Sequence, residues 1–507
     1  MKCSKVRHFS SHRCRYSLVV TESPIVSTAS GPVRGFWRDH GTAEASAAFL
    51  GIPFAQPPVG DLRFAAPVPP APWTEVRDTT EYGATALRTT GTDTLIPEPA
   101  VPGDSTLNVN VFTPSLNASL PVLVWIHGGG YTEGSPASPW YDGSRFNRDG
   151  VVTVSISYRL GFDGFGFIEG APHNRGARDW IAALEWVQQN IAAFGGDPAR
   201  VTIGGQSAGG GAVLTLLGMP TAQHLFHQAI SLSGALADVP FDEARQRSTR
   251  LAALAGVAAD VDGFRSVDEA TLHGLQGKAA SAKRGFAALT DQLANGLPWG
   301  PMIDGDLIGQ PTVDALRAGV GADRPLLLGA ADDEFTMLAE REQAALRLIP
   351  AALLLRPFIA DHVARRAYLE ANAPQRALGT AAMVGRYISD HIFRVLVPRV
   401  ADARLSADAA TWAYRFSWVS PAKGWACHCL DVPFWFDGLD RVRVDALAGP
   451  HPPQSLADEM HSAAVALVAD GDPGWAPWHS QPGTTRVFDG SGPHVTDTAY
   501  DSVLALL

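Results

Sequence analysis

The chain has 507 residues, of which 46% are hydrophobic and 18% are charged. This composition can bury a large core, so it excludes an intrinsically disordered protein, which combines low hydrophobicity with high charge. The formal net charge is −11. Because an acidic surface repels phosphate backbones, nucleic-acid binding is excluded as the principal role.

The N-terminal stretch is basic, with no acidic residue before Glu22. It lacks an apolar run of the length that a signal peptide needs. We therefore predict a disordered leader over 1–21, with an organellar presequence as the alternative, and one domain over 22–507. Four cysteines are too few for a disulfide scaffold in a chain of this length, so we expect reduced thiols and a cytoplasmic location.

From residue 120 onward, short apolar runs alternate with longer helical patterns. Runs that are apolar almost throughout predict strands buried on both faces, and the spacing of Trp180, Leu184, Val187 and Ile191 predicts a helix over 179–193. The predicted strands are 122–126, 151–156, 201–203, 227–232, 325–328 and 411–418, and a helical insertion near the active site is predicted over 335–400. This order is typical of an α/β protein whose mostly parallel sheet carries helices on both faces.

One segment, 201–237, contains no Asp, Glu, Lys or Arg and is long enough to span a membrane as a helix. It is interrupted by several glycines and by Pro220. We therefore expect it to form the buried centre of a soluble fold, and we expect no membrane partner.

A glycine-rich loop, His127-Gly-Gly-Gly-Tyr131, follows the strand predicted at 122–126. Successive glycines let backbone N–H groups point into one cavity, where they can stabilise an oxyanion. A phosphate-binding loop is the alternative, but the Gly-Lys-Ser/Thr sequence that it requires does not follow.

The segment Gly205-Gln-Ser-Ala-Gly209 lies between a predicted strand and a run, 210–217, that can start a helix. This is the setting of the G-x-S-x-G nucleophile elbow, whose sharp turn leaves no room for flanking side chains and exposes the serine hydroxyl. Ser207 is thus a candidate nucleophile at a helix N-terminus, where developing negative charge is favoured. The alternative is a glycine-rich turn with an uninvolved serine.

A serine nucleophile needs a base and an acid that orients the base. Asp332, Asp333 and Glu334 follow a predicted strand, and His428 lies in a late loop, so the order serine, acid, histidine is that of α/β-hydrolases. The neighbours Cys427 and Cys429 raise the possibility of zinc. Consecutive residues cannot all point at one ion, so we expect no metal.

Several motifs together resemble those of the type-B carboxylesterases, a family that includes cholinesterases and the non-catalytic neuroligins. The similarity runs from about Val26 to Pro493. It rests on the segments 49–64, 107–114, 157–161, 190–198, 329–334 and 427–434, in addition to the glycine loop and the elbow.

The resemblance implies an α/β-hydrolase fold and a triad of Ser207, His428 and Glu334, which selects Glu334 from the three acids. It implies oxyanion donors at the backbone N–H groups of Gly129, Gly130 and Ala208. Substrate contacts are expected, on weaker similarity, at Gln206, Tyr131, Leu297 and Trp299.

This chain departs from the family at positions that bear on substrate. Gln206 stands where many members have glutamate, which removes a charge beside the nucleophile, and Thr106 stands where a cysteine is frequent. The entrance aromatics of cholinesterases have no clear match in 70–90. We therefore expect neutral esters to be preferred over choline esters, with fairly short acyl chains.

The sequence predicts a serine carboxylesterase that hydrolyses small-molecule esters through an acyl-enzyme and needs no metal or cofactor. One alternative is a catalytically silent adhesion or scaffolding protein on the same fold. A second alternative is amide or carbamate hydrolysis by the same machinery. The oligomeric state and the natural ester are left open.

Overall fold

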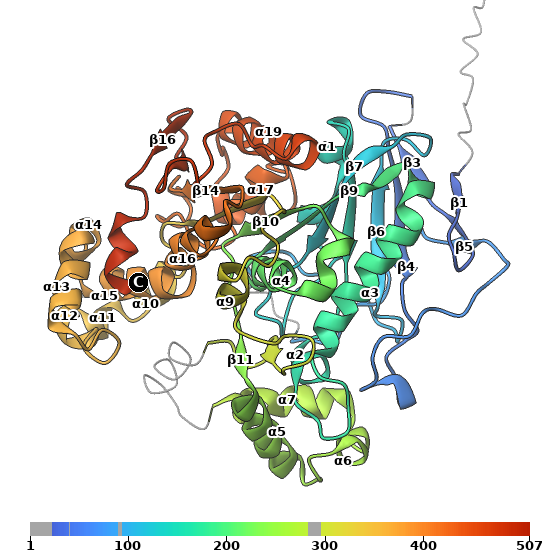
Figure 1. Ribbon diagram of the computed structural model, residues 1–507, viewed down its shortest axis with the longest axis horizontal. Coiled ribbons are helices and arrows are strands. Elements are labelled where there is room, and N and C mark those ends of the chain that lie inside the picture. The colour runs from blue at the N-terminus through green and yellow to red at the C-terminus, as the bar shows by residue number, and fades with distance from the viewer. Residues whose placement is uncertain (1–22, 40, 90–93, 282–295) are drawn as a thin grey trace, which may run out of the picture.

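The computed structural model describes residues 23–507 except residue 40 and the segments 90–93 and 282–295. The predicted leader, 1–21, lies outside the described residues. Eleven strands of the described chain form one sheet, in the order β16-β15-β14-β13-β10-β9-β7-β8-β6-β4-β3. Figure 1 shows how helices surround this sheet.

The seven neighbouring strands at the centre of the sheet, in the spatial order β8-β7-β9-β10-β13-β14-β15, all run parallel. They are β7 (Leu120–Ile126), β8 (Val152–Ile156), β9 (Gly196–Gln206), β10 (Gln228–Leu232), β13 (Leu326–Ala331), β14 (Thr411–Phe416) and β15 (Thr485–Phe488). This confirms the predicted mostly parallel sheet.

Antiparallel strands complete both edges of the sheet and were not predicted. They are β3 (Phe36–Arg38), β4 (Ser46–Pro53), β6 (Asn108–Thr113) and β16 (His494–Thr496). Separate small sheets are formed by β1 (Ile25–Ser27), β2 (Pro32–Arg34) and β5 (Arg77–Asp78), and by β11 (Val239–Pro240) with β12 (Met302–Ile303).

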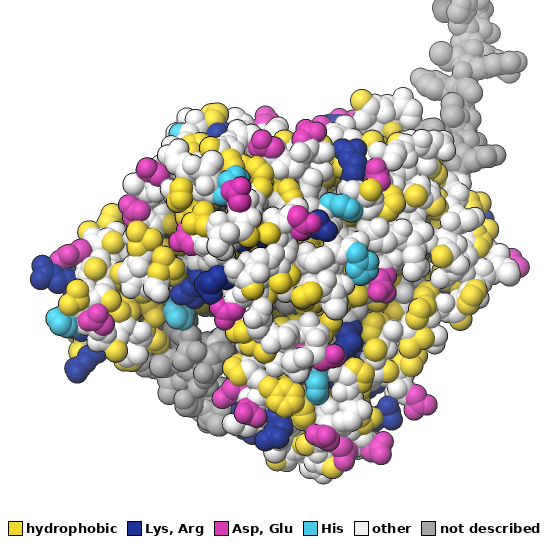
Figure 2. All heavy atoms as spheres, viewed as in Figure 1, with side chains coloured by type: hydrophobic (Ala, Val, Ile, Leu, Met, Phe, Trp, Pro, Cys, Tyr) yellow, Lys and Arg dark blue, Asp and Glu magenta, His cyan; other side chains and the backbone are white. Residues whose placement is uncertain are grey.

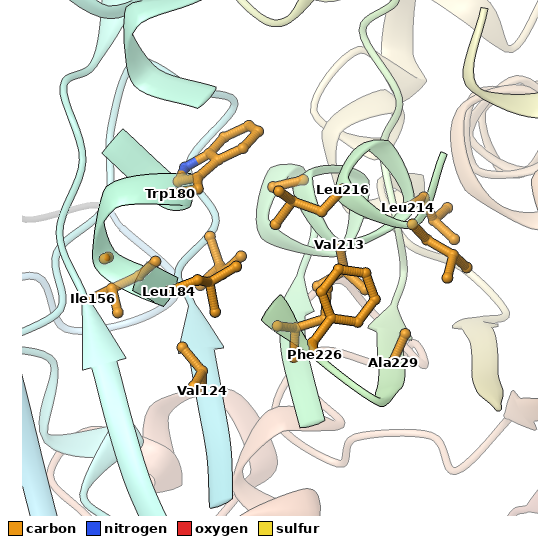
Figure 3. Packing of buried hydrophobic residues seen from close by; sticks show 14 of the residues in the cluster. Val124, Ile156, Trp180, Leu184, Val213, Leu214, Leu216, Phe226 and Ala229 are labelled. Atoms are coloured by element: carbon orange, nitrogen blue, oxygen red, sulfur yellow. The ribbon is translucent and has the colours of Figure 1, made fainter. Parts of the chain in front are cut away.

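Alternate residues of the central strands enter two different cores. In β7, Val122, Val124 and Ile126 belong to one core cluster, whereas Leu123 and Trp125 belong to the other. Figure 3 shows the first of these clusters, in which side chains of β7, β8 and β10 pack against those of α3 (Arg175–Asn190) and α4 (Ala208–Leu217). Each large side chain buried in this way contributes about 1.5–3 kcal/mol to stability.

Helices cover the two faces of the sheet. α3, α4 and α16 (Leu396–Ala403) pack on the first core, and α1 (Ser144–Arg148), α17 (Val432–Trp435), α18 (Val444–Ala448) and α19 (Gln454–Asp470) pack on the second. The helix predicted over 179–193 is α3, which starts one turn earlier and ends before a short 3₁₀ turn at Ile191–Phe194.

Two further groups of helices project away from the sheet and the helices that cover it (Figure 1). One contains α5 (Phe241–Ala255), α6 (Val261–Arg265) and α7 (Glu269–Ala280), close to α2 (Gly161–Phe165). The other is the predicted insertion, and it consists of short helices: α10 (Thr336–Glu340), α11 (Gln343–Leu346), α12 (Ala351–Leu354), α13 (His362–Ala371), α14 (Ala373–Ala377) and α15 (Thr380–Ser389), followed by a π-helical turn at Asp390–Arg394. α9 (Thr312–Arg317) lies between the two groups in sequence.

The uncharged segment 201–237 includes the end of β9, all of α4 and β10, and it is mostly buried, although Pro220, Thr221 and His224 in the turn between α4 and β10 are exposed. Among the described residues, no helix is both long and apolar enough to cross a bilayer. On the face shown in Figure 2, basic side chains are scattered between acidic ones rather than gathered in one continuous surface.

Candidate active site

Four loops meet at one edge of the sheet, where the parallel strands end. β7 ends at Ile126 and leads into the glycine loop, and β9 ends at Gln206, directly before Ser207. β13 ends at Ala331, three residues before Glu334, and β14 leads to the loop of His428. The carboxyl edge of a parallel sheet is where ligands bind in such folds.

The turn at Ser207 has the geometry of a nucleophile elbow. Ser207 adopts φ 61° and ψ −125° between β9 and α4. A Cβ atom at Gly209 would lie 2.1 Å from the carbonyl oxygen of Ile126, and one at Gly205 would lie 2.5 Å from the carbonyl carbon of Gly209. Both glycines are therefore required by close packing, and the strained backbone of Ser207 is held in place by its surroundings.

Ser207, His428 and Glu334 are hydrogen-bonded in series. Oγ of Ser207 lies 2.9 Å from Nε2 of His428. Nδ1 of His428 lies 2.5 Å from Oε2 of Glu334, whose other oxygen accepts the N–H of Ala331 at 2.8 Å. Glu334 is fully buried and His428 is 4% exposed. An orienting carboxylate on Nδ1 leaves Nε2 free to take a proton from the serine.

The three candidate acids have separate partners. Asp332 pairs with Arg415, both contacts at 2.7 Å, and Asp333 lies 3.4 Å from Arg386. Glu334 alone of the three contacts His428. Burial raises the pKa of Asp332, but Arg394 and Arg415 outweigh it and hold that pKa at about 2. Burial raises the pKa of Asp333 to about 6, although Arg386 opposes the shift.

The charge state of His428 is set by opposing effects. Burial lowers the pKa of its imidazole, whereas Cys429 and Glu334 raise it, and the net result is a pKa well above the ordinary 6.5. Burial also raises the pKa of the Cys429 thiol. This thiol is therefore uncharged at neutral pH, so we attribute the raised pKa of His428 to the carboxylate of Glu334.

The glycine loop lies directly against the elbow. A Cβ atom at Gly128 would lie 2.6 Å from the carbonyl oxygen of Gln206 and 3.0 Å from Cβ of Ser207. Within the described residues, the backbone N–H groups of Gly129, Gly130 and Ala208 donate no hydrogen bond to the protein. Free N–H groups beside a nucleophile can stabilise the oxyanion of a tetrahedral intermediate.

Gln206 and two aromatic rings contact His428 directly. Nε2 of Gln206 lies 3.3 Å from Nε2 of His428, and its Oε1 accepts the Cys429 thiol at 3.4 Å. The rings of Phe335 and Phe393 each lie 4.8 Å from the imidazole. The imidazole is therefore fixed on several sides, as a precisely placed base requires.

Two of the residues that were expected to contact substrate, Tyr131 and Trp299, are buried in apolar cores. Tyr131 is fully buried, its ring packs on Phe165, and its carbonyl accepts the N–H of Gly161 at 2.7 Å. Trp299 is 2% exposed and packs edge-on against Phe162. Both side chains therefore belong to apolar core clusters. Substrate contact at these two positions stays a prediction.

Leu297 does lie beside the site. Its Cδ2 would be 4.0 Å from a Cβ atom at Gly130, and it lines a cavity of about 530 Å³ that also includes Ala235. The N–H of Ala235 donates to the carbonyl of Ser207 at 3.0 Å. This cavity therefore borders the back of the elbow, on the side of the glycine loop.

The sequence did not predict the contacts that hold the imidazole of His428. Phe335 directly follows Glu334, so its position gave a signal, whereas Phe393 comes from the insertion, where no pattern marks it. From the sequence, Cys429 is expected to be a reduced thiol that binds no metal. Its actual partner is Gln206, and both ring nitrogens of His428 have other partners. In the part of the chain that the structure describes, no group of three His, Cys, Asp or Glu residues could hold a metal ion.

A serine, a histidine and a glutamate joined by hydrogen bonds at the carboxyl edge of a parallel sheet, with free N–H groups beside them, define a serine hydrolase of the α/β-hydrolase fold. The model of the carboxylesterase family matches residues 22–474. The chain belongs to this family and is a carboxylic ester hydrolase, which confirms the resemblance seen in the sequence. The alternative of a catalytically silent scaffolding protein is not supported.

Individual relatives agree with this assignment. The chain is 33% identical to a para-nitrobenzyl esterase of Bacillus subtilis over 92% of this chain and 94% of that protein. It is 34% identical to a phenmedipham hydrolase of Pseudarthrobacter oxydans over 89% and 90%, respectively. Among solved structures, a carboxylesterase of Geobacillus stearothermophilus is similar with a TM-score of 0.80 and 29% identity, covering 94% of this chain and 99% of that one.

Proposed function

We propose that Ser207 is the nucleophile of this esterase, with His428 as general base and Glu334 as its orienting acid. The observation that carries this proposal is the hydrogen-bonded series of the three side chains at 2.9 and 2.5 Å. Ser207 attacks the acyl carbon while His428 takes its proton and then returns it to the departing alcohol. Water hydrolyses the acyl-enzyme by the same route.

The oxyanion of each tetrahedral intermediate is stabilised, in this proposal, by the N–H groups of Gly129, Gly130 and Ala208. Such donors typically contribute about 10²–10³-fold each to the rate. The acyl portion of the substrate lies toward Leu297, which borders this loop. The enzyme acts on small-molecule esters, and every step above uses groups of this chain alone.

The proposal predicts a pH profile that is displaced to higher pH. The base must be neutral to accept the serine proton, so kcat/KM rises as pH increases through the pKa of His428. Because the pKa of His428 is raised, the rising limb should lie above the ordinary value of 6.5. Rates for a 4-nitrophenyl ester across pH 5–9 measure it.

A matched variant tests the origin of this limb. Gln206→Glu places a carboxylate near Nε2 of His428, where the amide now lies at 3.3 Å. An added negative charge favours the imidazolium, so the limb should move to still higher pH. A limb that is unmoved by this substitution, or that lies at or below pH 6 in the unaltered enzyme, would contradict the assignment of His428 as the titrating base.

We also propose that neutral esters are preferred over choline esters. A carboxylate at position 206 would attract a cationic alcohol with about 4 kcal/mol at 4 Å in an effective dielectric of 20, whereas Gln206 presents only a dipole. The comparison is kcat/KM for a neutral butyrate ester against butyrylcholine at low ionic strength. Gln206→Glu should raise the relative rate on butyrylcholine about tenfold or more. A clear preference of the unaltered enzyme for the choline ester would overturn this specificity.

A further inference from the structure

A second cavity, of about 460 Å³, lies at the same edge of the sheet, on the histidine side of the site. Its apolar wall includes Phe335, Met337 and Leu338, from the start of the helical insertion. Its wall also carries Arg341, Lys423 and Arg443, which come from three different segments of the chain. The cavity thus combines an apolar wall with three cations.

No acidic side chain is among the described residues that line this cavity. The neighbouring Glu340 does not line the cavity, and its carboxylate accepts the indole N–H of Trp425 at 2.8 Å. Arg443 donates to the carbonyl of Thr94 at 2.8 Å and so also holds the wall. Within the described residues, the side chains of Arg341 and Lys423 have neither an ion pair nor a hydrogen bond, and both are exposed.

Phe335 connects this cavity to the reacting groups. Phe335 lines the cavity, and its ring lies 4.8 Å from the imidazole of His428. His428 is the group that returns a proton to the departing alcohol, so the alcohol portion of an ester must lie against it. Leu297 is next to the glycine loop instead, on the acyl side. The cavity beyond Phe335 is therefore placed to receive the alcohol portion.

We propose that this cavity binds a carboxylate carried by the alcohol portion of the substrate, with Arg341 and Lys423 as the groups that attract it. The inference rests on the proposed function of the site. Cations gathered in one cavity of a chain with a net charge of −11 favour an anionic group there by direct Coulomb attraction. The apolar wall would hold the hydrocarbon that joins the carboxylate to the ester oxygen.

The test compares two esters that differ only in charge, 4-(carboxymethyl)phenyl butyrate and 4-(carbamoylmethyl)phenyl butyrate. Their acyl groups are identical, and the methylene keeps the leaving phenols similar. We expect kcat/KM to be about fivefold to tenfold higher for the carboxylate at low ionic strength, as two partly solvated ion pairs allow. The ratio should fall toward one in 1 M salt, where the Debye length is about 3 Å.

The variant Arg341→Gln/Lys423→Gln should bring this ratio close to one, and Arg443 is left in place because it holds the wall. The matched control is Arg347→Gln, an exposed arginine of the same insertion that does not line the cavity. This control should retain the ratio. Equal rates on the two esters in the unaltered enzyme, or a ratio that survives the double substitution, would overturn the proposal.

A second pair of esters separates the alcohol side from the acyl side. Phenyl esters of butanedioic acid, with the second acid group either free or as its amide, carry the charge on the acyl portion. A carboxylate preference found only in this pair would contradict the placement in the alcohol cavity. Failure of the proposed function looks different, because then even the neutral butyrate would not be hydrolysed in a Ser207-dependent way.

Discussion

Ser207→Ala is expected to lower kcat by about 10⁴-fold or more while the protein stays folded. The substitution removes the atom that would form the acyl-enzyme, so only the contribution of the oxyanion donors and of substrate binding is left. A 10⁴-fold loss corresponds to about 5.4 kcal/mol of transition-state stabilisation. The elbow itself should survive, because close packing at Gly205 and Gly209 holds its backbone. Single-turnover rates with a 4-nitrophenyl ester and a thermal unfolding curve measure both effects.

Ser233→Ala is the matched control for this substitution. Like Ser207, Ser233 has a positive φ, 45°, and it follows β10 at the same edge of the sheet, although Ser233 is fully buried whereas Ser207 is partly exposed. Its N–H donates to the carbonyl of Gly329, and no contact joins it to His428. Its replacement should leave activity within a few-fold of the unaltered enzyme. A well-folded Ser207→Ala enzyme with ordinary turnover would remove Ser207 from the mechanism.

The central sheet could be predicted because its strands are apolar on both faces. Runs such as 122–126 and 151–156 appear as β7 and β8 with nearly the predicted bounds. β9 is longer than its predicted core, since it extends back to Gly196 through a segment that contains Asp197, Pro198 and Arg200, where hydropathy gives no strand signal. The edge strand β16 has three residues, none of them fully buried, and it depends on pairing with β15.

The insertion shows where local pattern stops being informative. Its helical character was predicted, but not its division into short helices. Pro350 precedes α12, and Gly379, at φ 115°, precedes α15. Its attachment to the sheet depends on tertiary ion pairs, such as Arg394 with Asp332 at 3.5 Å. Ion pairs between residues so distant in sequence produce no periodic pattern, so the attachment could not be predicted from the sequence.

The reacting residues of the site could be predicted more readily than the residues that hold them in place. Ser207 and the glycine loop lie in motifs whose geometry is local, so sequence alone placed them. The acid is different, because the residues alone left Asp332, Asp333 and Glu334 equivalent and only the family resemblance selected one. In the structure, distant arginines make the distinction, since Arg415 and Arg386 engage the first two.

Glu334→Gln is expected to lower kcat by about 10³–10⁴-fold, because it changes both charge and tautomer. Oε1 of Glu334 accepts the N–H of Ala331 at 2.8 Å, which favours placing the carbonyl of the new amide there. Its NH₂ group would then donate to Nδ1 of His428. The imidazole then carries its proton on Nε2, so Nε2 cannot accept the proton of Ser207. The amide also cannot stabilise the imidazolium that forms during the reaction. Rates across pH 5–9 measure the loss.

Asp333→Asn is the comparison that decides between neighbouring acids. Asp333 is nearly as buried as Glu334, and its pKa, raised to about 6, means that a neutral side chain is close in energy to the charged one. An amide can keep the contacts of Asp333 with Arg386 and Thr336, both at 3.4 Å. We therefore expect a loss of less than about tenfold. If Asp333→Asn proved the more damaging change in folded protein, Glu334 would not be the acid. The 2.5 Å contact between Glu334 and His428 would then be structural only.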